Sequence, residues 1–523
     1  MANQFSFSTL PTANISRSRF DRDSQHKTTF NLGDIIPIYC DADILPGDTI
    51  SVDVASLVRM STPIRDIMDN IYLDYYSFFV PNRIIWKDWK KFMGESDTSG
   101  YVQTPPTMPT IDISSLTIVP GCIGDYLGIP SRCEGKVSSL PGRAYLAIYD
   151  RWFRDQNVIA PFNIDLGSTV SADYLDLGSS ISYGSKPLKA AKFSDYFTRA
   201  LPYAQKGPAV TLPLGTTARI GVIQSNPNAS VVVNGVASAD SGNGLTYVNG
   251  TTPGGGSVPL YADLANATAA TINDLRFAFA CQKLLEKDAL YGSRYWEVIN
   301  AHFGVKAPDA SLQDPEFIAH GRMRINIDQV LQTTGYSDEA GQSSLGAVGA
   351  NSVTAKKLNL STYSAVEHGV FMIVAVARHD QTYGQGLNRM WSRKERFDYY
   401  WPVFANLGAQ EIRNKEIFVQ NNSDDDKVFG YQEAWAEYRY RPSQVSGLLN
   451  PAFNNSLSFW TLANKFDALP TLSKSFIEQD RNNIKRALVT GETGPDFIAD
   501  FYFKATYVRP MPTYSIPGLI DHH

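Results

Sequence analysis

Residues 71–93 read IYLDYYSFFVPNRIIWKDWKKFM, and the fold prediction starts from this stretch. In its first half, successive side chains point to opposite faces of an extended chain, and both faces carry mostly apolar or aromatic groups. Such residues fit a pleated surface, so we expect a strand with both faces covered. Pro81 lacks an N–H for the sheet ladder and should end the strand. Aromatic residues then recur every three positions from 86 to 92, which predicts a short amphipathic helix packed against the sheet.

Further strand patterns lie on both sides of this stretch. Runs of alternating apolar residues, separated by turn residues, predict strands at 30–39, 48–60, 325–334, 370–378, 408–418, 428–439 and 497–508. The first two flank the turn sequence Leu45-Pro46-Gly47-Asp48. Because several short strands precede the first long helix, the order of elements favours a β-sandwich over an α/β sheet.

Helical periodicity is confined to two long connections between strands, at about 141–160 and 271–304. Gly304 is a suitable C-terminal cap for the second connection. Residues 1–26 are polar and are expected to form an extended N-terminal arm. We therefore predict one domain over 27–523, built as a β-sandwich with large inserted loops.

The composition changes abruptly between Gly215 and Pro259, where small residues dominate and charged residues nearly vanish. The run Val231, Val232, Val233, Asn234 and Gly235 is typical of a strand that enters a hairpin turn. The glycines Gly254, Gly255 and Gly256 are instead typical of a disordered linker. The valine run favours a structured surface insertion at about 215–262, and the linker remains the alternative.

Composition and charge narrow the class of protein. The formal net charge is −5, which counts against a chain coated in nucleic acid but permits a local basic patch. The four cysteines have no metal-binding or redox spacing and are expected to be free thiols. No stretch has the length of a signal peptide's apolar core or of a membrane span. A soluble protein made inside a cell is therefore expected.

The sequence contains none of the common catalytic or metal-binding motifs, so no catalytic residue, cofactor or metal ligand is predicted. Its strongest binding signal interleaves cations and aromatic rings: Arg389, Trp391, Arg393, Lys394, Arg396 and Tyr399. Cations neutralise phosphates and rings stack on unpaired bases, but arginine and aromatic residues are also common in protein interfaces. Contact with single-stranded DNA and contact with a neighbouring subunit both remain open. The same two readings apply to Arg17, Arg19 and Arg22 in the arm.

Segments along nearly the whole chain carry a family resemblance. They include LDYYSFFVPNRIIWKDWKKFMGE at 73–95, FNLGDIIPIYCDADILPGDT at 30–49, QKGPAVTLPLG at 205–215, QGLNRMWSRKERFDYYWPVFANLGAQEIRNKEIF at 385–418 and VFGYQEAWAEYRYRPSQVSG at 428–447. The segments at 272–317 and 499–522 belong to the same set. In their order along the chain, these segments resemble the major capsid proteins of gokushovirus-type microviruses, which are small single-stranded DNA bacteriophages.

The resemblance implies an eight-stranded viral jelly-roll β-sandwich with long inserted loops that contain helices. It also implies a structural protein, not an enzyme, that self-assembles as sixty copies into a T=1 icosahedral shell around circular single-stranded DNA. The insertion would form protrusions at the three-fold axes and contact a receptor on the host surface. Further implied partners are a minor DNA-binding or pilot protein, without membrane insertion, in a virion assembled in the host bacterial cytoplasm.

The alternative prediction is a carbohydrate-binding or carbohydrate-cleaving protein. A similar β-sandwich can bind or cleave carbohydrate, and cleavage needs only two carboxylates at the right separation. No feature of the sequence selects such a pair.

Overall fold

The computed structural model describes residues 16–95, 106–114, 116–168, 174–177, 181–208, 210, 219–222, 260–263, 272–291, 294–305, 308–335, 345–346, 348–491 and 493–514. Its contacts divide the chain into two compact units. The first unit consists of residues 1–204 and 289–523, and the second consists of residues 205–288. The predicted domain boundaries stay a prediction.

Strand β5 (Ile71–Pro81) lies inside a four-stranded antiparallel sheet, as the alternation in its sequence predicts. The order of this sheet is β10 (Glu316–Ile325), β5, β14 (Gly369–His379) and β3 (Ile36–Ile44). β5 pairs with β14 in unbroken register along its whole length. The predicted end of the strand at the proline is confirmed.

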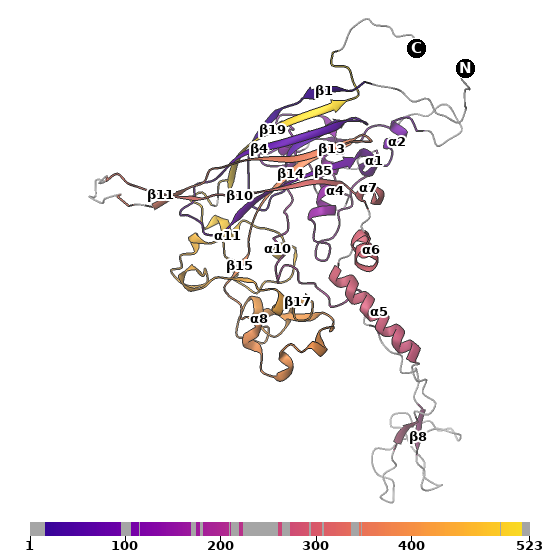
Figure 1. The fold of residues 1–523 in the computed structure, drawn as a ribbon, viewed down its shortest axis with the longest axis vertical. Coiled ribbons are helices and arrows are strands. Elements are labelled where there is room, and N and C mark those ends of the chain that lie inside the picture. Colours follow the sequence, from indigo (N-terminus) through magenta and orange to yellow (C-terminus); the bar gives the residue numbers. More distant parts are fainter. Residues whose placement is uncertain are drawn as a thin grey trace, which may run out of the picture. The chain divides into compact units, whose positions relative to one another are not determined.

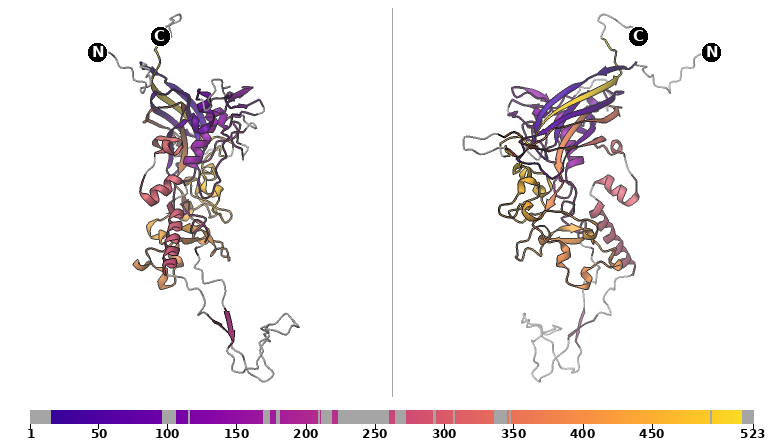
Figure 2. Two further views of the ribbon diagram at one scale, coloured as in Figure 1. Left: turned by 90° about the vertical axis from the view of Figure 1, so that its right-hand side faces the viewer. Right: turned by 60° about the vertical axis from the view of Figure 1, so that its left-hand side comes forward.

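A second antiparallel sheet joins the two ends of the described chain. Its path runs β1 (Ser18–Asp21), β19 (Phe497–Arg509), β4 (Thr49–Met60) and β13 (Thr354–Ser364). β2 (Ser24–Phe30) pairs with the other end of β19, so β1 and β2 lie along one edge of the same long strand. Figures 1 and 2 show these N-terminal strands in indigo beside the yellow C-terminal strand. Residues predicted to form part of a free arm are therefore strand residues.

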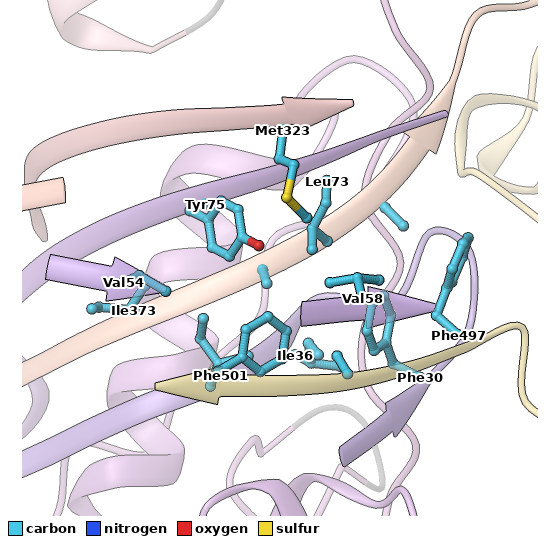
Figure 3. Packing of buried hydrophobic residues seen from close by; sticks show 14 of the residues in the cluster. Phe30, Ile36, Val54, Val58, Leu73, Tyr75, Met323, Ile373, Phe497 and Phe501 are labelled. Carbon is cyan, nitrogen blue, oxygen red and sulfur yellow. The ribbon is translucent and has the colours of Figure 1, made fainter. Parts of the chain in front are cut away.

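The main hydrophobic core lies between the two sheets. Alternate residues of β19, including Phe497, Phe501 and Tyr507, point inward and are buried, whereas the intervening Ile498 and Tyr502 are exposed. Figure 3 shows side chains from both sheets meeting in this layer. Burial of so many apolar side chains is the dominant stabilising contribution to the sandwich. The predicted mainly β architecture of antiparallel sheets is confirmed.

The opposite face of the β5 sheet is covered by helical connections. α4 (Leu140–Ile148) continues into a π-helical turn, η1 (Tyr149–Phe153), and both pack on Phe78 and its neighbours. The helix predicted after β5 is present as two short turns, α1 (Asn82–Ile85) and α2 (Trp89–Phe92), while Trp86 between them is fully buried. Both faces of β5 are therefore covered, as its composition predicts.

One predicted strand is wrong between β2 and β3. The predicted strand at 30–39 is interrupted, because β2 ends at Phe30 and β3 begins at Ile36. Gly33 has a positive φ of 82°, and a Cβ at this position would lie 2.2 Å from the carbonyl oxygen of Gln479. Only glycine fits a left-handed turn that another backbone approaches so closely.

Shorter elements occupy the remaining connections. They are β6 (Thr110–Asp112), α3 (Ile123–Tyr126), β7 (Lys136–Ser138), α7 (Asp309–Leu312), β11 (Asp328–Leu331), β12 (Val348–Asn351), β15 (Thr382–Tyr383), β16 (Gln410–Arg413), α8 (Asn414–Ile417), β17 (Val428–Gln432), α9 (Ala436–Arg439), β18 (Ser443–Gln444), α10 (Lys474–Ile477) and α11 (Asn482–Lys485). Two of the predicted strands, 408–418 and 428–439, are each a short strand followed by a helical turn. The bounds of the predicted strand at 325–334 are wrong, because β10 ends at Ile325, where this prediction begins, and only the short β11 lies inside it.

The predicted helical stretch at 271–304 consists of α5 (Ile272–Tyr291) and α6 (Tyr295–Phe303). α6 ends at Gly304, whose φ of 69° is left-handed, so the predicted C-terminal cap is confirmed. Within the second unit, β8 (Arg219–Val222) and β9 (Leu260–Asp263) form an antiparallel pair. The candidate host-facing residues from Gly215 to Pro259 that the sequence singled out all lie outside the described residues.

Candidate nucleic-acid or subunit interface

The basic–aromatic segment, residues 385–404, forms a chain of short turns between β15 and β16. Its three 3₁₀ turns are η2 (Arg389–Ser392), η3 (Arg396–Asp398) and η4 (Pro402–Phe404). Local side chains fix the first two turns. Asn388 accepts a hydrogen bond from the N–H of Met390 at 3.0 Å, and Asp398 accepts from the N–H groups of Lys394 and Glu395 at 2.7 and 2.8 Å. This explains an ordered conformation without a long helix or strand.

Two of the predicted cations are paired with carboxylates inside the protein. Arg389 lies 3.5 Å from Glu416 and 3.7 Å from Glu437, and it donates to the carbonyl oxygen of Glu411 at 2.8 Å. Arg393 lies 3.3 Å from the same Glu437. The side chains of Arg389 and Arg393 are only 18% and 12% exposed, so little of either charge faces solvent.

Burial also affects the carboxylates. Burial raises the pKa of Glu416, and the nearby charge of Arg389 opposes but does not cancel this effect. The sequence offered no pair of carboxylates for a carbohydrate-cleaving site. Although Glu416 and Glu437 lie close together, each is paired with an arginine, an arrangement that stabilises the fold instead of leaving an acid and a base free.

Aromatic rings surround the arginines of this segment. The Arg393 guanidinium lies 4.4 Å from the centroid of the Tyr438 ring and 5.4 Å from that of Tyr399. Arg396 is exposed and lies 4.8 Å from the centroid of Trp401. Such cation–π contacts hold the rings at the surface with defined orientations.

The solvent-facing part of the segment is therefore mainly aromatic. We call the exposed rings of this segment, together with that of Tyr438 in α9, the aromatic surface: Trp391, Phe397, Tyr399, Tyr400, Trp401 and Tyr438. These side chains are exposed, Trp391 to 70% and Phe397 to 65%. Lys394 and Arg396 are the exposed cations of the predicted set. Exposed rings suit both base stacking and burial against another subunit, so the two functions proposed for these residues stay predictions.

The three N-terminal arginines belong to a different part of the first unit. Arg22 pairs with Asp41, which also lies 3.9 Å from Arg509. The guanidinium of Arg22 lies 4.8 Å from the centroid of the Tyr507 ring. Arg19 forms an exposed pair with Asp21 at 3.1 Å. Arg17 is exposed. Arg22 thus helps to hold the N-terminal strands on β19, a role that its sequence context did not reveal.

A buried ionic centre on β5 was not selected from the sequence. Asp74 is fully buried and accepts hydrogen bonds from Arg322 at 2.5 Å and from Arg378 at 2.6 Å, while His320 lies 3.2 Å away. Burial alone would raise the pKa of Asp74, but the hydrogen bonds from the two arginines outweigh it and hold this pKa below its usual value. One signal was available: an aspartate inside a strand that is apolar on both faces requires cationic partners.

The described part of the chain lacks two other kinds of feature. No cluster of three or more histidine, cysteine, aspartate or glutamate side chains there is arranged to hold a metal ion. Among the same residues, no helix is both long and apolar enough to cross a membrane.

Comparison with known proteins gives a consistent family. The profile of the family described as "Capsid protein (F protein)" matches residues 8–519. The protein named "Capsid protein VP1" of Bdellovibrio phage phiMH2K is 39% identical over 539 aligned positions, covering 99% of this chain and 98% of that protein. Proteins of the same name from Spiroplasma virus 4 and Chlamydia phage 1 are 36% and 35% identical, each covering 98% of this chain and 97% of the relative. The predicted resemblance is confirmed.

Proposed function

The chain belongs to the capsid protein (F protein) family and is a structural capsid protein; on this premise we propose that sixty copies assemble into a closed T=1 icosahedral shell around circular single-stranded DNA. The observation that carries this proposal is the family match along nearly the whole chain, over residues 8–519. A match of this extent includes the sandwich and the long connections that a shell subunit needs for contacts with its neighbours.

The order of the strands supports a jelly roll. One sheet contains β2, β19, β4 and β13 in that spatial order, and the other contains β3, β14, β5 and β10. Along the chain, β2, β3, β4 and β5 alternate between the sheets, and so do β10, β13, β14 and β19. Two four-stranded antiparallel sheets with crossing connections are the arrangement of viral jelly rolls. We take β1 as an extension of the β2 edge.

The aromatic surface supports contacts made during assembly. Because closed symmetry repeats each contact many times, weak contacts between exposed rings add up to a stable shell. In this proposal the aromatic surface meets a neighbouring subunit or packaged DNA, and a minor DNA-binding or pilot protein is a further partner of the shell.

The insertion at about 215–262 supports a role in attachment. Its composition differs from the rest of the chain, and surface insertions are where binding functions concentrate. We propose that it forms protrusions at the three-fold axes and meets a receptor on the host surface. The subunit would be made and assembled in the host bacterial cytoplasm and then reside in the virion.

Particle mass tests the assembly proposal. Sixty chains of 57.8 kDa give a protein shell of roughly 3.5 MDa. Light scattering and electron microscopy of lysate from infected cells should find particles of that protein mass with DNA inside. A stable monomer as the only form in that lysate would contradict the proposal.

A loop replacement tests the attachment proposal. Replacing 215–259 with a short linker should leave the shells intact and reduce binding of particles to host cells. The matched control shortens another segment of polar and small residues, 336–344, and should leave host binding unchanged. Loss of assembly in the first variant would make the insertion a structural element instead.

A further inference from the structure

A recess of about 420 Å³ opens beside the face of the β5 sheet that α4 and η1 cover. It lies entirely in the first unit, where the π-helical turn η1 ends and the charged part of the sheet begins. Its walls come from three strands and this turn. They include Tyr76, Phe78, Trp152, Phe317, His320 and Arg378.

Aromatic rings form one end of the recess. The ring centroids of Trp152 and Phe317 are 5.3 Å apart, and Phe317 lies 5.8 Å from the buried Phe78. The indole N–H of Trp152 donates to the carbonyl oxygen of Pro315 at 3.1 Å, which fixes the ring. Phe317 is 39% exposed, so part of this rigid aromatic end remains open to a ligand. A π-helical turn such as η1 often marks a functional site.

Arg378 and His320 form the other end. Arg378 and Arg322 share the single carboxylate of Asp74, so two positive charges face one negative charge. The side chains of the lining residues His320 and Arg378 are 37% and 12% exposed. The buried Nε of Arg378 has no hydrogen-bond partner within the part of the chain that the structure describes.

We propose that this recess binds one nucleotide of single-stranded DNA. The base stacks on the exposed part of Phe317 beside Trp152, and the phosphate lies towards Arg378 and His320. Stacking of bases on aromatic rings tolerates any sequence, and an arginine beside it supplies the charge that a phosphate needs. The inference rests on the proposed capsid function and names a place where its genome is held.

Charge favours a nucleotide over an aromatic side chain from a neighbouring subunit. A buried aromatic side chain would use the rings but would leave the surplus cation without a partner. A nucleotide satisfies both ends of the recess, because its base is apolar on its faces and its phosphate is negative. An inserted protein side chain is therefore the competing outcome that the experiment must separate.

The test measures the binding of short thymidine oligonucleotides to the full-length protein by fluorescence anisotropy. Phe317→Leu keeps an apolar side chain but removes the ring. It should weaken binding about tenfold, the effect expected from loss of one stacked base. An oligonucleotide of the same length with abasic sites has the same phosphates, and it should bind the natural protein and Phe317→Leu equally. The matched control Tyr502→Leu removes an exposed ring from β19 and should leave binding unchanged.

Equal losses for the thymidine and abasic oligonucleotides, or no loss for either, would overturn the proposal. A second measurement needs no variant: photocross-linking of the natural protein to an oligonucleotide that carries 5-iodouracil. The expected adducts lie on Trp152 or Phe317, and adducts found only elsewhere would overturn the proposal. Particle mass tests capsid function separately, so DNA-filled shells without these adducts would refute the recess and leave the capsid function standing.

Discussion

The ionic centre on β5 gives a quantitative prediction. Asp74→Asn keeps the shape of the side chain but removes the negative charge that Arg322 and Arg378 share. Asp74 is fully buried, and the Arg378 side chain is only 12% exposed, so water cannot replace the lost partner at Arg378. The substitution therefore leaves one guanidinium buried and unpaired.

The expected loss in the free energy of unfolding is about 3–5 kcal/mol, the range found when one partner of a buried ion pair is removed. Asp53→Asn is the matched control. Asp53 of β4 pairs at 3.3 Å with Lys357 of the neighbouring β13, within the sheet that does not contain Asp74, and that lysine is 58% exposed. Loss of this surface pair should cost no more than about 1 kcal/mol. The assay is urea unfolding of the unassembled chain at pH 7, followed by tryptophan fluorescence.

The pH of the assay matters because the pKa of Asp74 is lowered in the folded chain. A carboxyl with a lowered folded pKa contributes stability above its unfolded pKa, and this contribution is lost as the pH falls through the folded pKa. At pH 7 it is fully present. In the double variant Asp74→Asn with Arg378→Gln, the buried unpaired cation is absent, so part of the loss should be recovered. If Asp74→Asn cost no more than Asp53→Asn, the assigned importance of this centre would be wrong.

Three further predictions follow from other parts of the structure. A Cβ at Gly386 would lie 2.0 Å from the carbonyl oxygen of Glu416. Gly386→Ala should therefore lower the free energy of unfolding by about 1–3 kcal/mol, measured by urea unfolding. Gly335→Ala, at an open position, should have little effect. Burial lowers the pKa of His379 to about 4 from an ordinary 6.5. As the pH drops from 6.5 to 4, the imidazole is protonated in the unfolded chain before it is protonated in the folded chain, so the free energy of unfolding falls by about 3 kcal/mol. His379→Gln should flatten that part of the stability–pH curve, and an unchanged slope would contradict the assignment. Arg396→Glu should lower DNA retention in a salt-dependent way and leave assembly intact, whereas unchanged packaging would exclude a phosphate contact by this arginine.

The choice of Arg396 for that last variant comes from the ion pairs. Reversal of charge at Arg389 or Arg393 would place another carboxylate beside Glu416 and Glu437, which are themselves largely buried. The segment would then lose its internal pairing, and a loss of DNA could follow from misfolding alone. Arg396 is exposed and contacts a ring, so its charge can be changed with less damage to the fold.

The strands of the sandwich could be predicted where burial imposes a simple alternation. β19 buries every second residue and β5 is covered on both faces, and both strands were predicted within one residue at each end. β1 and β2 were missed because they are edge strands with many exposed polar residues, so their sequence is that of a solvated arm. The two helical turns after β5 were predicted as one, since spacing alone does not reveal that Trp86 lies between them.

The candidate site was less predictable because its charges are paired over long separations in sequence. The aromatic and basic composition of 385–404 predicts an interface, and that stays a prediction. The pairing of its arginines depends on Glu416, which follows β16, and on Glu437, which follows β17. No local pattern specifies such a pairing. The recess beside β5 has the same origin, because its walls are brought together from three separate strands and one turn.

These pairings bear on the proposal that the chain holds DNA. The chain has a formal net charge of −5, and Arg22, Arg389 and Arg393 are engaged with carboxylates of the same chain. A mechanism based on many free cations is therefore poorly suited to this subunit. Stacking of bases on fixed aromatic rings needs little net charge, and a few surplus cations then suffice to orient the phosphates. The recess beside β5 combines open rings with one surplus cation, so binding there should depend more weakly on salt than binding through a basic arm.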